Sequence, residues 1–295
     1  MLNNSIIQRK LDKPLQKELN GIGYTMENLV NYGENIFRKM QDQFQGVELA
    51  APFFTLMTHM LNMLDGISIL VKKGSSEGIL PLCRSMFETS IYFKHMYNKP
   101  LSEGAIHYQV CYARKEIKKN KSLDLSTIEG KKQKETLSRE MPNYPIPNTS
   151  WKEESKYLLE FLNKEQVKPV NDLWDSQKRE PKNWYTLSSG AATFRELTKM
   201  YNMETYYVFL YRETSEFIHG SNTMSNVTVH EGKGYISLRK PDDIPAYCTM
   251  VFSIIRDIFF LVEGDNFLKW FEENVYEQII KTTKLNIITD FGLKA

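Results

Sequence analysis

The segment PFFTLMTHMLNMLDGISILVKKG, residues 52–74, decides the fold because it has the pattern of a long apolar helix. Its apolar side chains recur every three or four residues, the spacing of one helix face: Phe53, Leu56, Met60, Leu64, Ile67 and Leu70. Pro52 suits the first turn of a helix, and Lys72-Lys73-Gly74 is a typical C-terminal stop. The segment therefore predicts one apolar helix of a helical core.

Helical periodicity continues on both sides of this segment. The predicted helices cover residues 11–45 (one or two helices, with weak breaks at Gly21 and Gly23), 75–98, 101–120, 151–163, 191–202 and 204–220. Residues 121–140 are polar and predict an exposed helical extension, and the three prolines within 141–147 exclude a regular helix there. Residues 169–181 are predicted to be irregular.

A different pattern follows the last of these helices. Apolar and polar residues alternate on both sides of the glycine-containing turn at 231–234, which predicts a β-hairpin at 226–238. Two apolar helices are predicted at 245–283. The sequence thus predicts a single all-α domain over residues 1–295, a helical bundle with its core at about 50–225 and one small hairpin.

Composition excludes several classes of protein. Hydrophobic residues make up 41% of the 295 residues and charged residues 25%, as in a globular protein with a core. The net charge of +2 gives no global basic field, and three cysteines far apart predict neither a disulfide framework nor a zinc site. The polar N-terminus argues against secretion, and Arg256 and Asp257 interrupt the most apolar run, which predicts a buried helix. We expect a cytoplasmic protein without membrane contact.

The segment YRETSEFIHG, residues 211–220, combines groups suited to phosphodiester chemistry. On an α-helix, Arg212, Ser215, Glu216 and His219 occupy positions i, i+3, i+4 and i+7 and share one face. An arginine can hold a phosphate through two hydrogen bonds, and a histidine can transfer a proton near neutral pH. The alternative is an exposed charged stripe on an amphipathic helix.

A second polar set interrupts the apolar helix at 75–98. Arg84 and Glu88 lie four residues apart, and a buried charge needs a partner. They could form an internal ion pair that joins two helices, or Arg84 could face the helix at 204–220 as a second cation for a phosphate. Tyr108 and Arg114 on the next helix could join that site. We expect the two polar sets to face one another, because each charge would then meet an opposite charge. Glu88 would contact Arg212 or His219, and Arg84 would lie close to Glu216 or the Ser215 hydroxyl.

Known cofactor motifs are absent from the sequence. It contains no GxxxxGK[ST] loop, no GxGxxG after a strand, no HExxH and no cysteine–histidine cluster, so neither a cofactor nor a metal is expected. The lysine-rich residues 114–134 could add affinity for nucleic acid, although a solvated helix face has the same composition.

Two motifs resemble a known family. LCRSMFE at residues 82–88, together with Tyr211-Arg212, Ser215 and His219, resembles uncharacterised bacterial proteins that share an R…FE helix and a later Y-R-x-x-S-x-x-x-H helix. The six residues between Arg212 and His219 also fit the R-x(4–6)-H pattern of the HEPN superfamily, helical bundles that include many metal-independent ribonucleases of bacterial defence and toxin–antitoxin systems. HEPN nucleases usually have Asn, Asp or His after the arginine, where this chain has Glu213.

This resemblance implies a metal-independent endoribonuclease that acts on RNA as a homodimer. Arg212 and His219 would be the catalytic pair, Arg84 would assist, and Ser215 and Glu216 would orient His219. The alternative is a non-catalytic module of a bacterial defence system, in which the same residues bind a nucleotide or a partner protein, or stabilise the bundle.

Overall fold

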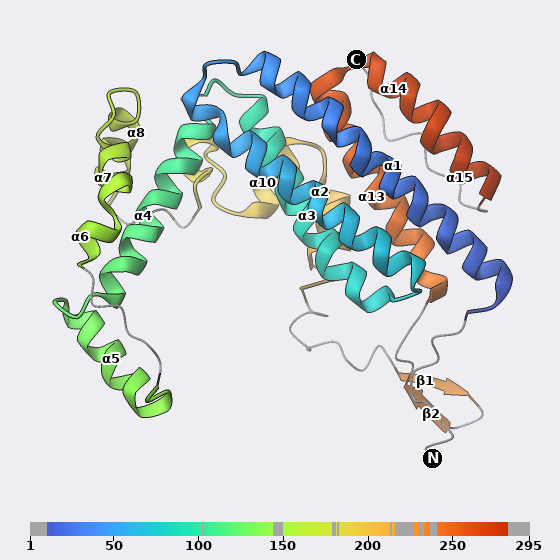
Figure 1. The fold of residues 1–295 in the computed structure, drawn as a ribbon, viewed down its shortest axis with the longest axis horizontal. Coiled ribbons are helices and arrows are strands. Elements are labelled where there is room, and N and C mark those ends of the chain that lie inside the picture. The colour runs from blue at the N-terminus through green and yellow to red at the C-terminus, as the bar shows by residue number, and fades with distance from the viewer. Residues whose placement is uncertain are drawn as a thin grey trace. The chain divides into compact units, whose positions relative to one another are not determined.

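The computed structural model describes residues 11–101, 103–143, 150–178, 181, 183–212, 214–215, 227–230, 233–236 and 241–282. Contacts divide the chain into two units: unit 1 combines Met1–His95 with Thr198–Ala295, and unit 2 is the intervening segment Met96–Leu197. Helices form nearly all regular structure in the described ranges, which confirms the predicted all-α bundle (Figure 1). The single domain over 1–295 stays a prediction.

Unit 1 is built on long helices from both ends of the chain. Its elements are α1 (Lys13–Gln43), η1 (Glu48–Ala50), α2 (Ala51–Lys72), most of α3 (Ser76–Tyr97), the end of α10 (Phe194–Met200), α11 (Glu204–Tyr206), η2 (Tyr207–Arg212), β1 (Val227–His230), β2 (Lys233–Ile236), η4 (Pro241–Asp243), α13 (Ile244–Glu263), α14 (Asp265–Phe271), η5 (Glu272–Tyr276) and α15 (Glu277–Thr282). Helix α1 packs along α2, α13 and α15 (Figure 1).

Helix α1 is continuous through the two glycines that the sequence marked as weak breaks. The Asp12 side chain caps its first turn by accepting a hydrogen bond from the Leu15 backbone N–H at 2.8 Å. A side chain at Gly23 would place its Cβ 2.4 Å from Cγ of Lys72, so this glycine allows α1 to approach α2 closely. The apolar face of α1 is fully buried: Leu19, Ile22, Met26, Leu29, Ile36 and Met40.

Aromatic side chains join α1 to α13 and α14. The Tyr32 ring lies 6.1 Å from Phe259, 5.3 Å from Phe267 and 4.1 Å from Trp270, measured between centroids. The Tyr32 hydroxyl donates a hydrogen bond to the Glu263 carboxylate at 2.8 Å. Phe259 is fully buried within the unit, so it is not available for a contact with a second chain.

Two segments are long and apolar enough to cross a membrane by length and composition alone, Glu48–Lys72 and Ile244–Glu263. The core helix of a soluble protein passes the same test. Both segments bury one face within unit 1, and Asp257 in the second pairs with Lys94 of α3 at 3.1 Å. Packing within unit 1 therefore accounts for their apolar composition, and the expected lack of membrane contact stays a prediction.

Unit 2 is organised around one helix. Helices α6 (Trp151–Glu154), α7 (Lys156–Leu162) and α8 (Lys168–Asp175) pack against α4 (Ala105–Leu123), and α5 (Ile128–Glu140) adjoins the end of α4 (Figure 1). The unit also contains α9 (Thr186–Ser189) and the start of α10. The Asp124 carboxylate ties these elements together, because it accepts hydrogen bonds from the backbone N–H groups of Ser126 at 2.6 Å and Trp151 at 2.7 Å. A hydrogen bond with the Ser126 side chain, together with these two backbone bonds, holds the pKa of Asp124 below its usual value.

Two local predictions in unit 2 were wrong. Residues 169–181 were predicted to be irregular, but α8 occupies most of that range with Pro169 in its first turn, where a proline is tolerated. The predicted single helix at 151–163 is divided at Ser155, which ends α6 and precedes α7. Ser155 is buried, and its hydroxyl accepts a hydrogen bond from the Asn120 side chain at 3.0 Å.

The only strands among the described residues are β1 and β2. They pair antiparallel, with Val227 opposite Ile236 and His230 opposite Lys233. They lie within residues 226–238, the range of the predicted hairpin.

Gly130 leads to a first stability prediction. An added Cβ at this position would lie 1.8 Å from the backbone oxygen of Asp124, closer than any real contact. We expect Gly130→Ala to detach the start of α5 and to lower the free energy of unfolding by about 1–3 kcal/mol. Ile128→Ala on the same helix is the control, since Ile128 is 84% exposed. Equal thermal midpoints for the two variants would contradict the prediction.

Candidate functional site

The polar set predicted around Arg84 and Glu88 forms a half-buried stripe along α3. The apolar residues of α3 are buried, among them Ile79, Cys83, Met86, Phe87 and Ile91, and the stripe comprises Arg84, Ser85, Glu88 and Tyr92. The Tyr92 hydroxyl donates to the Glu88 carboxylate at 2.7 Å. Because both are only half-buried, Arg84 and Glu88 retain contact with solvent, and this lowers the free-energy cost of keeping them charged.

The structure brings Arg84 to the polar segment that begins at Tyr211. The Arg84 guanidinium lies over the ring of Tyr211, 4.2 Å from its centroid. Such a cation–π contact stabilises the position of the guanidinium while its in-plane N–H groups can still bind a phosphate. The two segments thus meet although more than a hundred residues separate them. The predicted contact of Glu88 with Arg212 or His219 stays a prediction.

The segment that holds Tyr211 and Arg212 is a π-helix, η2, rather than an α-helix. Hydrogen bonds in a π-helix join residues five apart, so side chains do not follow the 3.6-residue spacing assumed from the sequence. The Tyr207 and Tyr211 rings stack at 5.2 Å, and Arg212 is exposed. Short π-helical turns occur often at functional sites.

The structure describes only part of the predicted catalytic face. Thr214 and Ser215 are helical; Thr214 is buried and its hydroxyl donates to the backbone carbonyl of Leu210. Glu216 and His219 lie outside the described residues. The shared face of Arg212, Ser215, Glu216 and His219 therefore stays a prediction.

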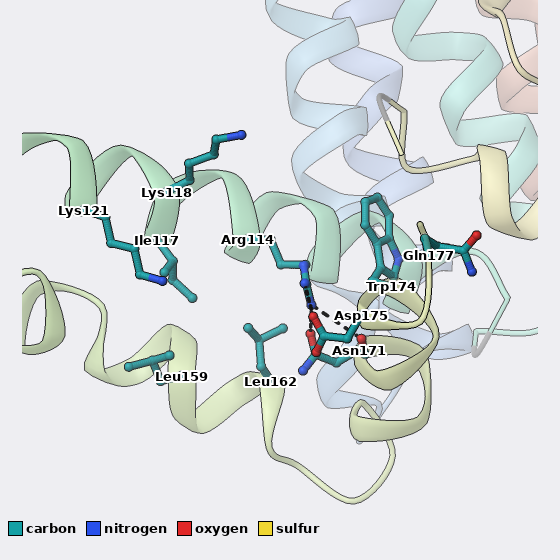
Figure 2. A pocket seen from close by; sticks show the side chains of 10 residues that line it. All are labelled: Arg114, Ile117, Lys118, Lys121, Leu159, Leu162, Asn171, Trp174, Asp175 and Gln177. Carbon is teal, nitrogen blue, oxygen red and sulfur yellow. Dashed lines mark hydrogen bonds and ion pairs between the residues drawn. The ribbon is translucent and has the colours of Figure 1, made fainter. Parts of the chain in front are cut away.

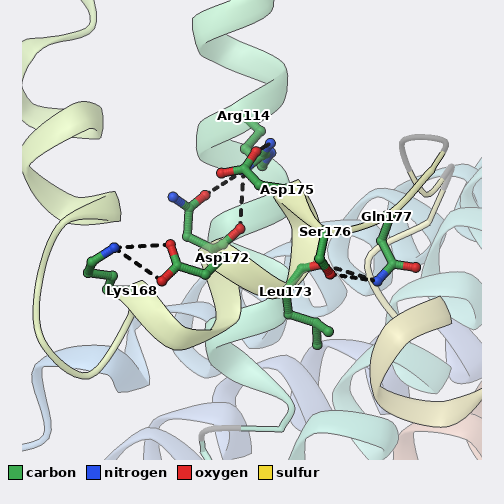
Figure 3. Close-up of polar contacts among 8 residues, drawn as sticks. Arg114, Lys168, Asp172, Leu173, Asp175, Ser176 and Gln177 are labelled. Carbon is green, nitrogen blue, oxygen red and sulfur yellow. Dashed lines mark hydrogen bonds and ion pairs between the residues drawn. The ribbon is translucent and has the colours of Figure 1, made fainter.

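Tyr108 and Arg114 lie in unit 2, whereas Arg84 and Arg212 lie in unit 1. The Tyr108 ring meets Trp184 edge to face at 5.4 Å, and burial raises the pKa of Tyr108 above its usual value. Arg114 donates to Oδ1 of Asn171 at 2.5 Å (Figure 2) and forms an ion pair with Asp175 (Figure 3). The hydrogen bond from Arg114 lowers the pKa of Asp175.

Arg114 also lines a pocket of about 570 Å³ between α4, α7 and α8, here called the Arg114 pocket (Figure 2). Its apolar wall consists of Ile117, Leu159, Leu162 and Trp174. Its polar lining consists of Arg114, Lys118, Lys121, Asn171, Asp175 and Gln177. A volume of this size suits a small organic ligand.

Sequence reasoning missed several polar groups near these sites. His59 of α2 is exposed and its Nε2 lies 2.9 Å from Oγ of Ser85, a contact that spacing within one helix cannot show. Asn171, Trp174 and Asp175 were missed because α8 was predicted to be irregular. Pro169 followed by the apolar Val170, Leu173 and Trp174 was the available signal. Across the described ranges, no group of three or more His, Cys, Asp or Glu side chains could hold a metal ion.

Comparison with known proteins identifies the family to which the chain belongs. No curated protein and no solved structure matches the chain. The model of the DUF5677 family, a family of unknown function, matches residues 50–235 and thus spans α2, α3, unit 2, η2 and most of the β-hairpin. Since the match covers more than half of the chain, this protein belongs to the DUF5677 family.

Proposed function

We propose that the protein is a metal-independent endoribonuclease of the bacterial defence or toxin–antitoxin type, with a HEPN-like bundle. Arg212 and His219 are the catalytic pair of this proposal, and a cytoplasmic homodimer completes the site. The observation that carries it is the contact between Arg84 and Tyr211, because it joins the two motifs on which the resemblance rests.

The proposed reaction needs two arginines and one histidine. Arg212 is exposed and can hold a phosphate of the RNA backbone in bidentate fashion. Arg84 supplies a second cation for the charge that develops on the phosphate oxygens during attack. His219 removes the proton of the ribose 2′-hydroxyl, whose oxygen attacks the adjacent phosphorus and displaces the 5′-oxygen of the next nucleotide. The leaving 5′-oxygen takes a proton from water and His219 releases its proton to water, so the products are a 2′,3′-cyclic phosphate and a 5′-hydroxyl.

Tyr211 has a positioning role in this proposal. The ring of Tyr211, the residue before Arg212 in the chain, holds the Arg84 guanidinium through its face and does not use the guanidinium N–H groups. A carboxylate partner in the same place would neutralise Arg84 and weaken its attraction for phosphate.

The test is incubation of the purified protein with total RNA in excess EDTA, alongside single-stranded DNA of matched length. We expect RNA to be cut to fragments that end in 2′,3′-cyclic phosphate and DNA to stay intact, since DNA lacks the attacking hydroxyl. Loss of activity in EDTA, or equal cleavage of DNA, would exclude this mechanism. Light scattering at micromolar concentration tests the homodimer.

A further inference from the structure

We propose that Glu88 of α3 selects the base at the cleavage site, by accepting two hydrogen bonds from a guanine next to the cleaved phosphate. Glu88 would then determine which RNA sequence is cut, so this role rests on the proposed function. The residues that carry it are Arg84, Glu88 and Tyr92 of the half-buried stripe on α3, together with Tyr211 of η2.

The two charges of the stripe are not paired with each other. Arg84 and Glu88 lie four residues apart on α3 and share one face of the helix, a spacing at which opposite charges can form an ion pair. Each is held by an aromatic residue instead. The Arg84 guanidinium lies 4.2 Å from the centroid of the Tyr211 ring, and the Glu88 carboxylate accepts the Tyr92 hydroxyl at 2.7 Å. A cation and a carboxylate are thus held side by side, and one ligand can engage both.

The Glu88 carboxylate is accessible to a ligand. A carboxylate offers about four lone-pair sites on its two oxygens. The Tyr92 hydroxyl occupies one of them, on Oε1, and so fixes the orientation of the group. The second oxygen, Oε2, has no hydrogen bond within the described chain, yet it is not among the described polar atoms that are buried without a partner. Oε2 is therefore in contact with solvent.

Guanine fits two adjacent acceptors better than the other bases of RNA. Its Watson–Crick edge presents two neighbouring donors, N1–H and the 2-amino group, which can bond to the two oxygens of one carboxylate. Adenine and cytosine each present an amino group beside a ring nitrogen that is an acceptor, and uracil presents one N–H between two carbonyl oxygens. Arg84 lies about one helical turn from Glu88, so it can hold the phosphate of the nucleotide whose base reaches Glu88.

Cleavage of matched short RNAs tests this role. The RNAs are uridine oligomers in which a single position carries guanosine, inosine or uridine, and each cut is mapped. We expect cleavage beside guanosine to exceed cleavage beside uridine at least about tenfold, as one bidentate contact to a base edge provides. Inosine lacks the 2-amino group and should give an intermediate rate. Equal rates at the three bases would overturn the role of Glu88 and leave the nuclease proposal standing, whereas no cleavage of any RNA would overturn both.

Three variants assign the preference to Glu88. Glu88→Gln keeps the size of the side chain but replaces one acceptor by an amide donor, so the ratio of the guanosine rate to the uridine rate should fall at least about tenfold. Tyr92→Phe removes the hydroxyl that orients the carboxylate and should lower the same ratio by less. Glu77→Gln is the matched control and should keep the wild-type ratio, because Glu77 lies on α3 roughly 16 Å along the axis from Glu88.

The ratio compares two substrates of the same protein, so partial unfolding of a variant lowers both rates and leaves the ratio unchanged. A Glu88→Gln enzyme that retains the wild-type ratio, or an equal loss of the ratio in Glu77→Gln, would refute the assignment.

Discussion

Substitution of His219 by alanine is expected to lower the rate of RNA cleavage by ~10²–10⁴-fold, the usual cost of removing a general acid or base. Because the proposed role of His219 is proton transfer, the thermal unfolding midpoint is expected to remain that of the wild type. The measurement is single-turnover cleavage of a short RNA with excess enzyme, so that the rate reports chemistry rather than product release.

Two further variants make this result specific. His230→Ala removes another histidine, on β1, and should leave the rate unchanged. Arg212→Lys keeps a positive charge but loses the planar fork, so it should reduce the rate even when RNA is saturating. A His219→Ala enzyme that cleaves at the wild-type rate would rule out the catalytic pair, whatever the other variants do.

The long helices could be predicted because their apolar spacing is set by packing against a core. Residues 52–74 and 75–98 correspond closely to α2 and α3, and a proline and a glycine mark the limits of α2. Short helices were harder, because α6, α7 and α8 each span few turns and so offer few residues in which a helical period can be recognised. All three helices contact α4, and this packing stabilises them.

The candidate site was only partly predictable for a related reason. Arg84 could be singled out because it interrupts an apolar helix, and Arg212 because its spacing predicts a helix face shared with Ser215, Glu216 and His219. That Tyr211 would be the partner of Arg84 depends on the π-helical turn of η2, which has no clear signature in sequence. Arg114 was expected to join that site, yet its contacts in the structure are with Asn171 and Asp175 of α8, a helix that was not predicted.

The largest expected loss of stability comes from Phe259. Its ring is fully buried between α1 and α14, with ring centroids 6.1 Å from Tyr32 and 5.3 Å from Phe267. Truncation removes the buried ring and leaves a cavity that the two aromatic side chains beside it cannot fill, because Tyr32 is held by its hydrogen bond to Glu263. We expect Phe259→Ala to lower the free energy of unfolding by about 3–5 kcal/mol.

Chemical denaturation followed by circular dichroism measures this loss, with Phe209→Ala as the matched control. Phe209 is 54% exposed, and its substitution should change the free energy by less than about 0.5 kcal/mol. The same experiment distinguishes a role of Phe259 in the core of unit 1 from a role in a dimer interface. If Phe259 stabilised a dimer rather than unit 1, the wild-type denaturation midpoint would rise with protein concentration and the variant would lose that dependence. Since Phe259 is buried within a single chain, we expect the difference between the two proteins to be the same at every concentration.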